Sequence, residues 1–187
     1  MRIAALRVRV LSLAELTGRG LALVARSDAR MLQRVGRLPV SGRLACALRA
    51  ASHLGDGWLW VGTAAVLAAG SGERPGPLAA GATAAALTNL CLVAAKRGVR
   101  RERPPRLFAG IAPPDRYSFP SGHTANAFAA CSVLAASFPE ATPALAVLAL
   151  CIAASRVLLG VHYPSDVLAG GALGSGAAIF SLELLAP

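Results

Sequence analysis

The spacing between one histidine and one aspartate would allow the histidine to act as a nucleophile. His162 is followed four residues later by Asp166, and Pro164 between them forces a turn. If that turn folds back, the Asp166 carboxylate accepts the Nδ1–H of His162 and leaves Nε2 unprotonated and nucleophilic. The plainer interpretation makes Asp166, or Ser165 beside it, only the N-cap of a last helix, with His162 an interfacial residue.

A second histidine follows a run suited to holding an anion. The run is Pro120-Ser121-Gly122-His123, at the start of an apolar stretch. Ser121 is a good helix N-cap residue, and Gly122 would let a ligand approach the backbone. The free N–H groups and the positive dipole end of a helix beginning here would bind phosphate, with His123 beside it. The alternative is a capped helix that carries an interfacial histidine.

Three cations could complete such a site. Lys96 and Arg103 are seven residues apart, so on one helix they lie two turns apart on nearly the same side and can converge on one anion. Arg156 lies near the end of an apolar stretch, where an unpaired guanidinium is costly and usually functional. Taken alone, the basic residues around Lys96 also fit a juxtamembrane cluster that contacts lipid headgroups.

Together these residues match the needs of phosphate ester cleavage. That reaction requires cations around the non-bridging oxygens, an in-line nucleophile and an acid for the leaving oxygen. Lys96, Arg103 and Arg156 would supply the cations, His162 the nucleophile and His123 the acid. No carboxylate cluster suited to a metal is visible in the sequence, so we expect neither a metal nor another cofactor.

The elements that must position these residues are membrane helices. Of the 187 residues 55% are hydrophobic, and the mean hydropathy is +0.57, too apolar for an ordinary soluble fold. We expect an all-α transmembrane bundle of about five spans: Trp58 to Gly70, Leu78 to Ala95, Phe119 to Phe138, Ala144 to Gly160 and Val167 to Leu185. Gly170 and Gly174 form a small-residue pair that lets helices approach closely.

The N-terminal part is more polar than the rest. Residues 1–54 are expected to form basic amphipathic helices on the membrane interface, followed by a transmembrane phosphatase domain over residues 55–187. The first helix would run from Ile3 to Ala25, and the second from a Ser41 cap to about His53, after a break at Pro39 and Gly42. A degenerate extra span over residues 8–25 stays open, although it would bury Glu15 and Arg19. No cleaved signal peptide is expected.

Charge indicates lipid and phosphate rather than nucleic acid. The net charge is +10, but aromatic residues make up only 5% and the arginines flank apolar spans. With five spans, all Lys and Arg residues except Arg74 fall on the face that carries the candidate site, which the positive-inside tendency places in the cytoplasm. Four cysteines without a CxxC spacing support neither a disulfide framework nor a zinc site.

The three motifs in this order resemble the type 2 phosphatidic acid phosphatase superfamily. They are Lys96-x6-Arg103-Pro104, Pro120-Ser121-Gly122-His123 and Ser155-Arg156-x5-His162-x3-Asp166. The resemblance covers roughly residues 55–185 and implies metal-independent hydrolysis of lipid phosphates or diphosphates through phosphohistidine. It implies a role in phosphate binding for Lys96, Arg103, Ser121, Gly122 and Arg156. It also implies that His123 is the acid, His162 the nucleophile and Asp166 its partner.

Several functional questions stay open at the level of sequence. Polyprenyl phosphate or diphosphate, phosphatidate, phosphatidylglycerophosphate and polyprenyl-linked phosphosugars all present the same phosphoryl group. Many bacterial relatives have six spans and an outward-facing site, whereas this sequence predicts five. A catalytically silent lipid-binding scaffold and a vanadate-dependent haloperoxidase are alternatives from other classes. A homo-oligomer is equally compatible with the sequence.

Overall fold

The computed structural model is all-helical in the part of the chain that it describes. It describes residues 13–38, 41–70, 76–105 and 115–185, which contain seven α-helices and one short 3-10 helix, and no strand beyond a single bridge between Glu102 and Tyr117. This confirms the expected fold class.

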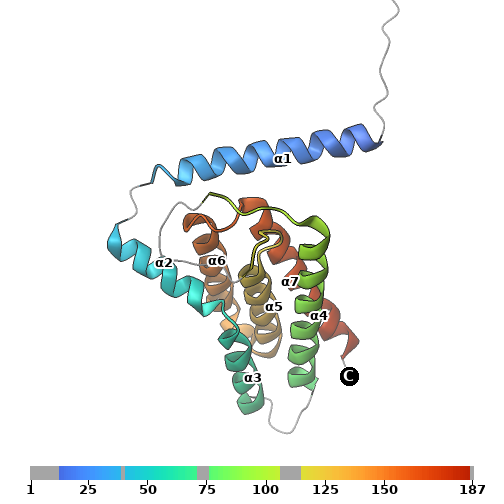
Figure 1. Ribbon diagram of the computed structural model, residues 1–187. Coiled ribbons are helices and arrows are strands. Elements are labelled where there is room, and N and C mark those ends of the chain that lie inside the picture. Colours follow the sequence, from blue (N-terminus) through green and yellow to red (C-terminus); the bar gives the residue numbers. More distant parts are fainter. Residues whose placement is uncertain (1–12, 39–40, 71–75, 106–114, 186–187) are drawn as a thin grey trace, which may run out of the picture.

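Five helices run side by side as a bundle (Figure 1). They are α3 (Trp58–Gly70), α4 (Gly76–Val99), α5 (Gly122–Ser137), α6 (Thr142–Leu158) and α7 (Pro164–Leu184), and they correspond to the five expected spans. By length and hydropathy α4, α7 and the stretch Pro139–Leu158 can cross a bilayer, whereas α3 is a shorter apolar helix. A bilayer span usually needs about 20 residues, so the count of full spans is at least three by this criterion.

The two N-terminal helices differ in their boundaries from the expectation. α1 (Leu13–Val35) lies across one end of the bundle, and α2 (Gly42–Leu54) leads down from it to α3 (Figure 1). The expected end at Ala25 was wrong, because no Pro or Gly interrupts the chain until Gly36. The start expected at Ile3 lies outside the described residues. The second helix follows the prediction, since the Ser41 hydroxyl accepts a hydrogen bond from the Leu44 N–H.

A central helix and close glycine contacts hold the bundle together. α5 packs against α3, α4, α6 and α7, and much of its surface is buried alanine. A Cβ atom at Gly170 would lie 2.5 Å from the Ser121 carbonyl oxygen, and one at Gly174 would overlap the Ala125 carbonyl. Only glycine permits this approach of α7 to α5, as the small-residue pair predicted. The contact fixes the start of α5 against the start of α7.

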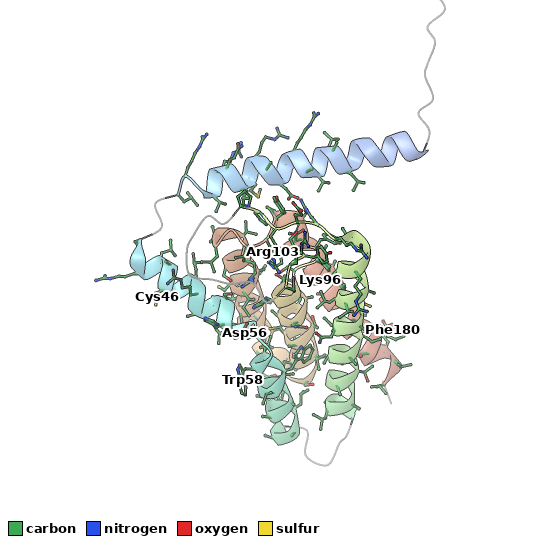
Figure 2. All side chains as sticks on the ribbon, viewed as in Figure 1. Cys46, Asp56, Trp58, Lys96, Arg103 and Phe180 are labelled. Carbon is green, nitrogen blue, oxygen red and sulfur yellow. The ribbon has the colours of Figure 1, made fainter. Side chains whose placement is uncertain are left out.

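Large apolar side chains cover the outside of the bundle, as expected where lipid is the solvent. Figure 2 labels two of them, Trp58 at the start of α3 and Phe180 on α7, both pointing outward. Other exposed large hydrophobic residues on these helices are Val61, Leu90, Val147, Leu150, Leu168 and Ile179. The interior is mostly apolar but also holds buried polar and charged side chains, which inside a membrane bundle are usually functional.

The chain leaves α4 before it reaches Arg103. Arg100 has a φ of 49°, in the left-handed region, and residues 101–103 then run extended beside Tyr117 and Ser118. The expectation that Lys96 and Arg103 lie on one helix was therefore wrong. They converge because the chain turns back over the helix end, and not because of helical periodicity.

Candidate active site

His162 lies buried in the short turn between α6 and α7. The residue is 1% exposed, and the turn depends on Gly160, whose φ of 67° favours glycine. Nη1 of Arg103 lies 3.1 Å from Nε2. Because a guanidinium can only donate, Nε2 must be the acceptor, and the proton of the neutral ring is then on Nδ1.

The other side of the imidazole faces Asp166. Nδ1 lies 3.6 Å from Oδ2 of Asp166, within ion-pair range but too long for a good hydrogen bond. Burial, followed by the positive charges of Arg103 and Arg156, lowers the pKa of His162 to about 4 despite the carboxylate. The ring is therefore neutral at physiological pH, and Nε2 carries a lone pair that accepts from Arg103 here and can attack phosphorus once this hydrogen bond is released.

Asp166 is fully buried and has several partners. Oδ2 accepts a hydrogen bond of 2.9 Å from the Tyr163 N–H, so this carboxylate caps α7 from its first turn while it faces His162. Oδ1 accepts a charge-assisted bond of 2.8 Å from Nη1 of Arg101. The two sequence interpretations of Asp166, cap and histidine partner, are thus compatible. Arg101 lies between Lys96 and Arg103 in the sequence, within the unspecified x6 of the first motif.

Lys96 and Arg103 converge on one anion, the carboxylate of Asp115. Nζ of Lys96 lies 2.7 Å from Oδ2 and Nη2 of Arg103 lies 2.8 Å from Oδ1. Burial alone would raise the pKa of Asp115, but the hydrogen bonds from these two cations lower it below its usual value. Figure 2 shows Lys96 and Arg103 close together at the end of the bundle that α1 covers. No motif or spacing in the sequence singles out Asp115.

Arg156 is buried at the C-terminal end of α6. Its side chain is 2% exposed, Nη1 donates to the Ser52 hydroxyl of α2, and Nε has no hydrogen-bond partner among the described residues. A buried guanidinium N–H without a partner is costly, and a phosphate oxygen would satisfy it. Arg156 also belongs to the segment of His162, because its carbonyl accepts from the His162 N–H at 3.2 Å.

The start of α5 lies directly against the His162 turn. The Ser121 N–H donates to the Asp166 carbonyl at 2.9 Å. The hydroxyl of Ser121 does not cap the helix as expected, since it instead accepts a hydrogen bond from the Thr124 hydroxyl at 3.0 Å. A Cβ at Gly122 would meet only Leu92, at 3.8 Å, so space remains beside this residue.

His123 is paired with a carboxylate from the α2–α3 junction. Its Nε2 lies 2.7 Å from Oδ1 of Asp56, and the exposed His53 places Nδ1 at 3.0 Å from Oδ2 of the same carboxylate. Burial would raise the pKa of Asp56, but the hydrogen bonds from His53 and His123 lower it. Asp56 belongs to none of the three sequence motifs.

All the candidate residues gather at one end of the bundle. Arg103 and Arg156 lie close enough to both His123 and His162 to interact electrostatically with each ring. A phosphoryl group bound at Arg103 and Arg156 would meet cations on its oxygens and lie near an unprotonated nitrogen and a carboxylate-supported imidazole. The arrangement can therefore perform phosphoryl transfer.

Comparisons with known proteins agree with this chemistry. Residues 77–186 match the model of the PAP2 superfamily. The decaprenylphosphoryl-5-phosphoribose phosphatase of Mycolicibacterium smegmatis is 42% identical over 127 residues, covering 65% of this chain and 68% of that protein. The protein of the same name from Mycobacterium tuberculosis strain H37Rv is 40% identical over 139 residues, covering 72% and 76%.

The fold has counterparts among solved structures. Aquifex aeolicus LpxE superposes with a TM-score of 0.71 at 24% identity, over 83% of this chain and 94% of that one. A transmembrane PAP2 type phosphatidylglycerolphosphate phosphatase from Bacillus subtilis also gives 0.71, at 23% identity, over 87% and 86%. The family match over more than half of the sequence, together with the relatives of 40% identity or more, shows that this chain belongs to the PAP2 superfamily.

Proposed function

We propose that this protein hydrolyses a lipid phosphate in two steps through a phosphohistidine at His162. Its superfamily and the relatives it resembles make it a membrane phosphatase of lipid phosphates. The assignment of individual residues to steps, the identity of the lipid and the side of the membrane are our proposals.

In the first step the lone pair of His162 Nε2 attacks phosphorus and the bond to the ester oxygen breaks. His123 gives its proton to that oxygen, and the alcohol leaves. Asp56, at 2.7 Å from His123 Nε2, stabilises the protonated ring before this transfer. Lys96, Arg103 and Arg156, with the Ser121 hydroxyl and the backbone N–H of Gly122, bind the non-bridging oxygens.

In the second step water replaces the histidine. His123, now neutral, takes a proton from water, whose oxygen attacks phosphorus while the P–N bond breaks. Inorganic phosphate leaves, and His162 and His123 return to their starting states. Asp166 stabilises the positive charge that the His162 ring carries while it is phosphorylated, in the manner of the aspartate of a catalytic triad.

One observation carries this proposal. The Arg103 guanidinium contacts the nucleophilic nitrogen of His162 through Nη1 and the Asp115 carboxylate through Nη2. A phosphate that takes the place of the Asp115 carboxylate binds the same guanidinium that contacts His162. Its phosphorus atom therefore lies near Nε2 of His162. Guanidinium groups are typical ligands of phosphate, because their N–H donors lie in a fixed planar fork.

For the lipid we favour a polyprenyl-linked phosphosugar. The relatives that match over 127 and 139 residues are decaprenylphosphoryl-5-phosphoribose phosphatases. Shorter matches are the phosphatidylglycerophosphatase B of Bacillus subtilis, at 37% identity, and the undecaprenyl-diphosphatase of Sulfolobus acidocaldarius, at 36%. Their lipids are the competing candidates, and all of them are phosphoric esters or anhydrides at the end of an apolar chain.

We place the active site on the cytoplasmic face of the cell membrane. Lys and Arg gather at the end of the bundle that carries the site, and α1 exposes Arg26, Arg30 and Arg34 there. A single cysteine introduced at the exposed position of Glu102, with the four native cysteines replaced by serine, tests this with membrane-impermeant maleimide. Labelling of intact cells at that position would contradict the assignment.

The hydrolysis itself is tested with the purified protein in detergent. Phosphate release is followed from the phosphoribosyl polyprenyl phosphate, from phosphatidylglycerophosphate and from undecaprenyl diphosphate, each with and without EDTA. We expect turnover that EDTA does not abolish and that vanadate inhibits, and the fastest turnover with the phosphosugar lipid. His162→Ala should abolish turnover, whereas Glu140→Gln, an exposed carboxylate at the opposite end of the bundle, should not change it. Substantial turnover by the His162 variant would refute the proposed nucleophile.

A further inference from the structure

A buried carboxylate from α1 lies outside the part of the chain that matches the superfamily. Asp28 is 3% exposed, and it shares one face of α1 with Leu32 and Val35, which are 7% and 8% exposed. The rest of the described surface of this helix from Gly20 onward is exposed. The family match begins only at residue 77. Buried carboxylates are rare unless they are paired, so this one requires an explanation.

Asp28 is bound to the first turn of α7 and to one arginine. Its Oδ1 accepts from the Ser165 N–H at 3.0 Å, and its Oδ2 accepts from the Ser165 hydroxyl at 2.5 Å and from Nη2 of Arg101 at 2.7 Å. Ser165 directly precedes Asp166 in sequence. The carboxylate of α1 is thus attached at two points to the segment that carries the partner of the nucleophile.

Arg101 continues the connection into the site. Its Nη1 donates to Oδ1 of Asp166 at 2.8 Å and to the Ser165 hydroxyl at 2.7 Å, and its guanidinium carbon lies 4.1 Å from the centre of the Tyr163 ring. Burial alone would lower the pKa of Arg101, but the two carboxylates raise it above its usual value. One guanidinium therefore holds two carboxylates, of which the inner one faces His162.

We propose that Asp28 is a positioning residue for the His162–Asp166 pair and acts through Arg101 and Ser165. The inference rests on the proposed role of His162. The physical reason is a balance of charge. With Asp28 in place the guanidinium is neutralised from outside and held by three hydrogen bonds and one ring contact, so Asp166 keeps one oxygen directed at the imidazole. Without that charge Arg101 is left with Asp166 as its only carboxylate partner among the described residues. Arg101 then competes with His162 for the Asp166 carboxylate.

A carboxylate that merely attaches α1 would behave differently. Leu32 and Val35 already bury an apolar stripe of α1. Asp28 adds a buried charge, and its removal affects the residues that its partner Arg101 contacts. Loss of a simple anchor lowers thermal stability and leaves the turnover of the folded fraction unchanged. Loss of a positioning residue lowers turnover of the folded protein, with substrate binding nearly unchanged.

The test compares Asp28→Asn, Arg101→Met and the double variant, each as the full chain purified in detergent. For Asp28→Asn we expect kcat to fall about tenfold, the scale seen when outer partners of active groups are removed, with KM within about twofold. The rate of phosphoenzyme formation in a single turnover should fall by the same factor. Because Asp28 acts through Arg101, the double variant should be no slower than Arg101→Met alone. Ser27→Ala, an exposed neighbour on α1, is the matched control and should resemble the parent.

Two results would overturn the inference: an unchanged kcat in Asp28→Asn, or losses that multiply in the double variant. If Asp28→Asn does not give monodisperse protein, Ser165→Ala replaces it, since this hydroxyl binds both Asp28 and Arg101. An unchanged kcat there overturns the inference equally. The His162→Ala variant distinguishes failure of the proposed function from failure of the role of Asp28. If that variant is active, the proposed function fails. If it is inactive and Asp28→Asn turns over normally, only the role of Asp28 fails.

Discussion

Asp115 is the residue whose replacement should improve substrate binding. Its carboxylate bridges Lys96 and Arg103, two of the cations assigned to the substrate phosphate. A phosphoryl group must displace this carboxylate before it can bind both cations. Asp115→Asn removes the charge and keeps the size of the side chain, so the substrate phosphate should no longer compete with a carboxylate for Lys96 and Arg103.

The size of the effect follows from the geometry and the exposure of the pair. Both contacts are short, at 2.7 and 2.8 Å, but the Asp115 side chain is 40% exposed and solvent screens it. Partly exposed ion pairs are worth about 0.5–1 kcal/mol each, so the two together stabilise the closed arrangement by about 1–2 kcal/mol. That range corresponds to a decrease of about 5- to 30-fold in KM, and in the inhibition constant of vanadate.

The assay is steady-state phosphate release at several ionic strengths, with vanadate inhibition measured in parallel. KM should fall while kcat changes little, because Asp115 leaves before the chemical step. The difference between parent and variant should narrow as salt rises. Glu140→Gln controls for the loss of one negative charge. A rise in KM would refute the reasoning, since it would mean that Asp115 holds Lys96 and Arg103 in position for the substrate rather than competing with it.

Three further predictions concern the nucleophile, the acid and the packing. Because burial and two arginines lower the pKa of His162 to about 4, the ring stays neutral well below pH 6.5, and the acid limb of kcat/KM, corrected for ionisation of the substrate phosphate, should lie below about pH 5. A limb centred near 6.5 would contradict this. Asp56→Asn leaves His123 without its carboxylate, so turnover of esters with poor leaving groups should fall at least tenfold more than that of activated aryl esters, in line with the usual range for acid catalysis. Equal losses would exclude a role of Asp56 in leaving-group protonation. Gly174→Ala forces a Cβ against the Ala125 carbonyl and should cost about 2–3 kcal/mol of stability in a thermal melt, whereas Gly176→Ala, with open space around it, should cost nothing measurable. A stable Gly174 variant would mean that α5 and α7 can move apart.

The sequence predicted the bundle well because membrane helices are specified locally. Long apolar runs and the pair Gly170 and Gly174 report directly on spans and on close packing, and neither depends on distant contacts. Boundaries were less certain where no breaker marks them, which is why α1 continues to Val35. The cap residue of α5 was identified, but its hydroxyl turned toward Thr124, a choice that depends on the tertiary packing of α7 against this turn.

The partners of the candidate residues were beyond the reach of the sequence. Asp28, Asp56 and Asp115 are single carboxylates in loops or on an amphipathic helix, without a spacing that points to any histidine or arginine. Their contacts join residues far apart in the chain, such as Asp28 with Ser165 and Asp56 with His123. Periodicity and motif spacing carry no information about such pairs, because only the packing of the bundle brings them together.

The role of Arg101 was not predicted, because a continuous helix was expected from Lys96 to Arg103. On a continuous helix Arg101 would lie about 140° around the axis from Lys96, and so would face away from the site that Lys96 and Arg103 share. The chain instead leaves the helix at Arg100 and runs extended, and side chains two residues apart in an extended segment lie on the same side. Arg101 and Arg103 consequently both point at the 162–166 turn, the first to Asp166 and the second to His162. One short extended segment thus fixes both members of the pair, which a helix at this position could not do.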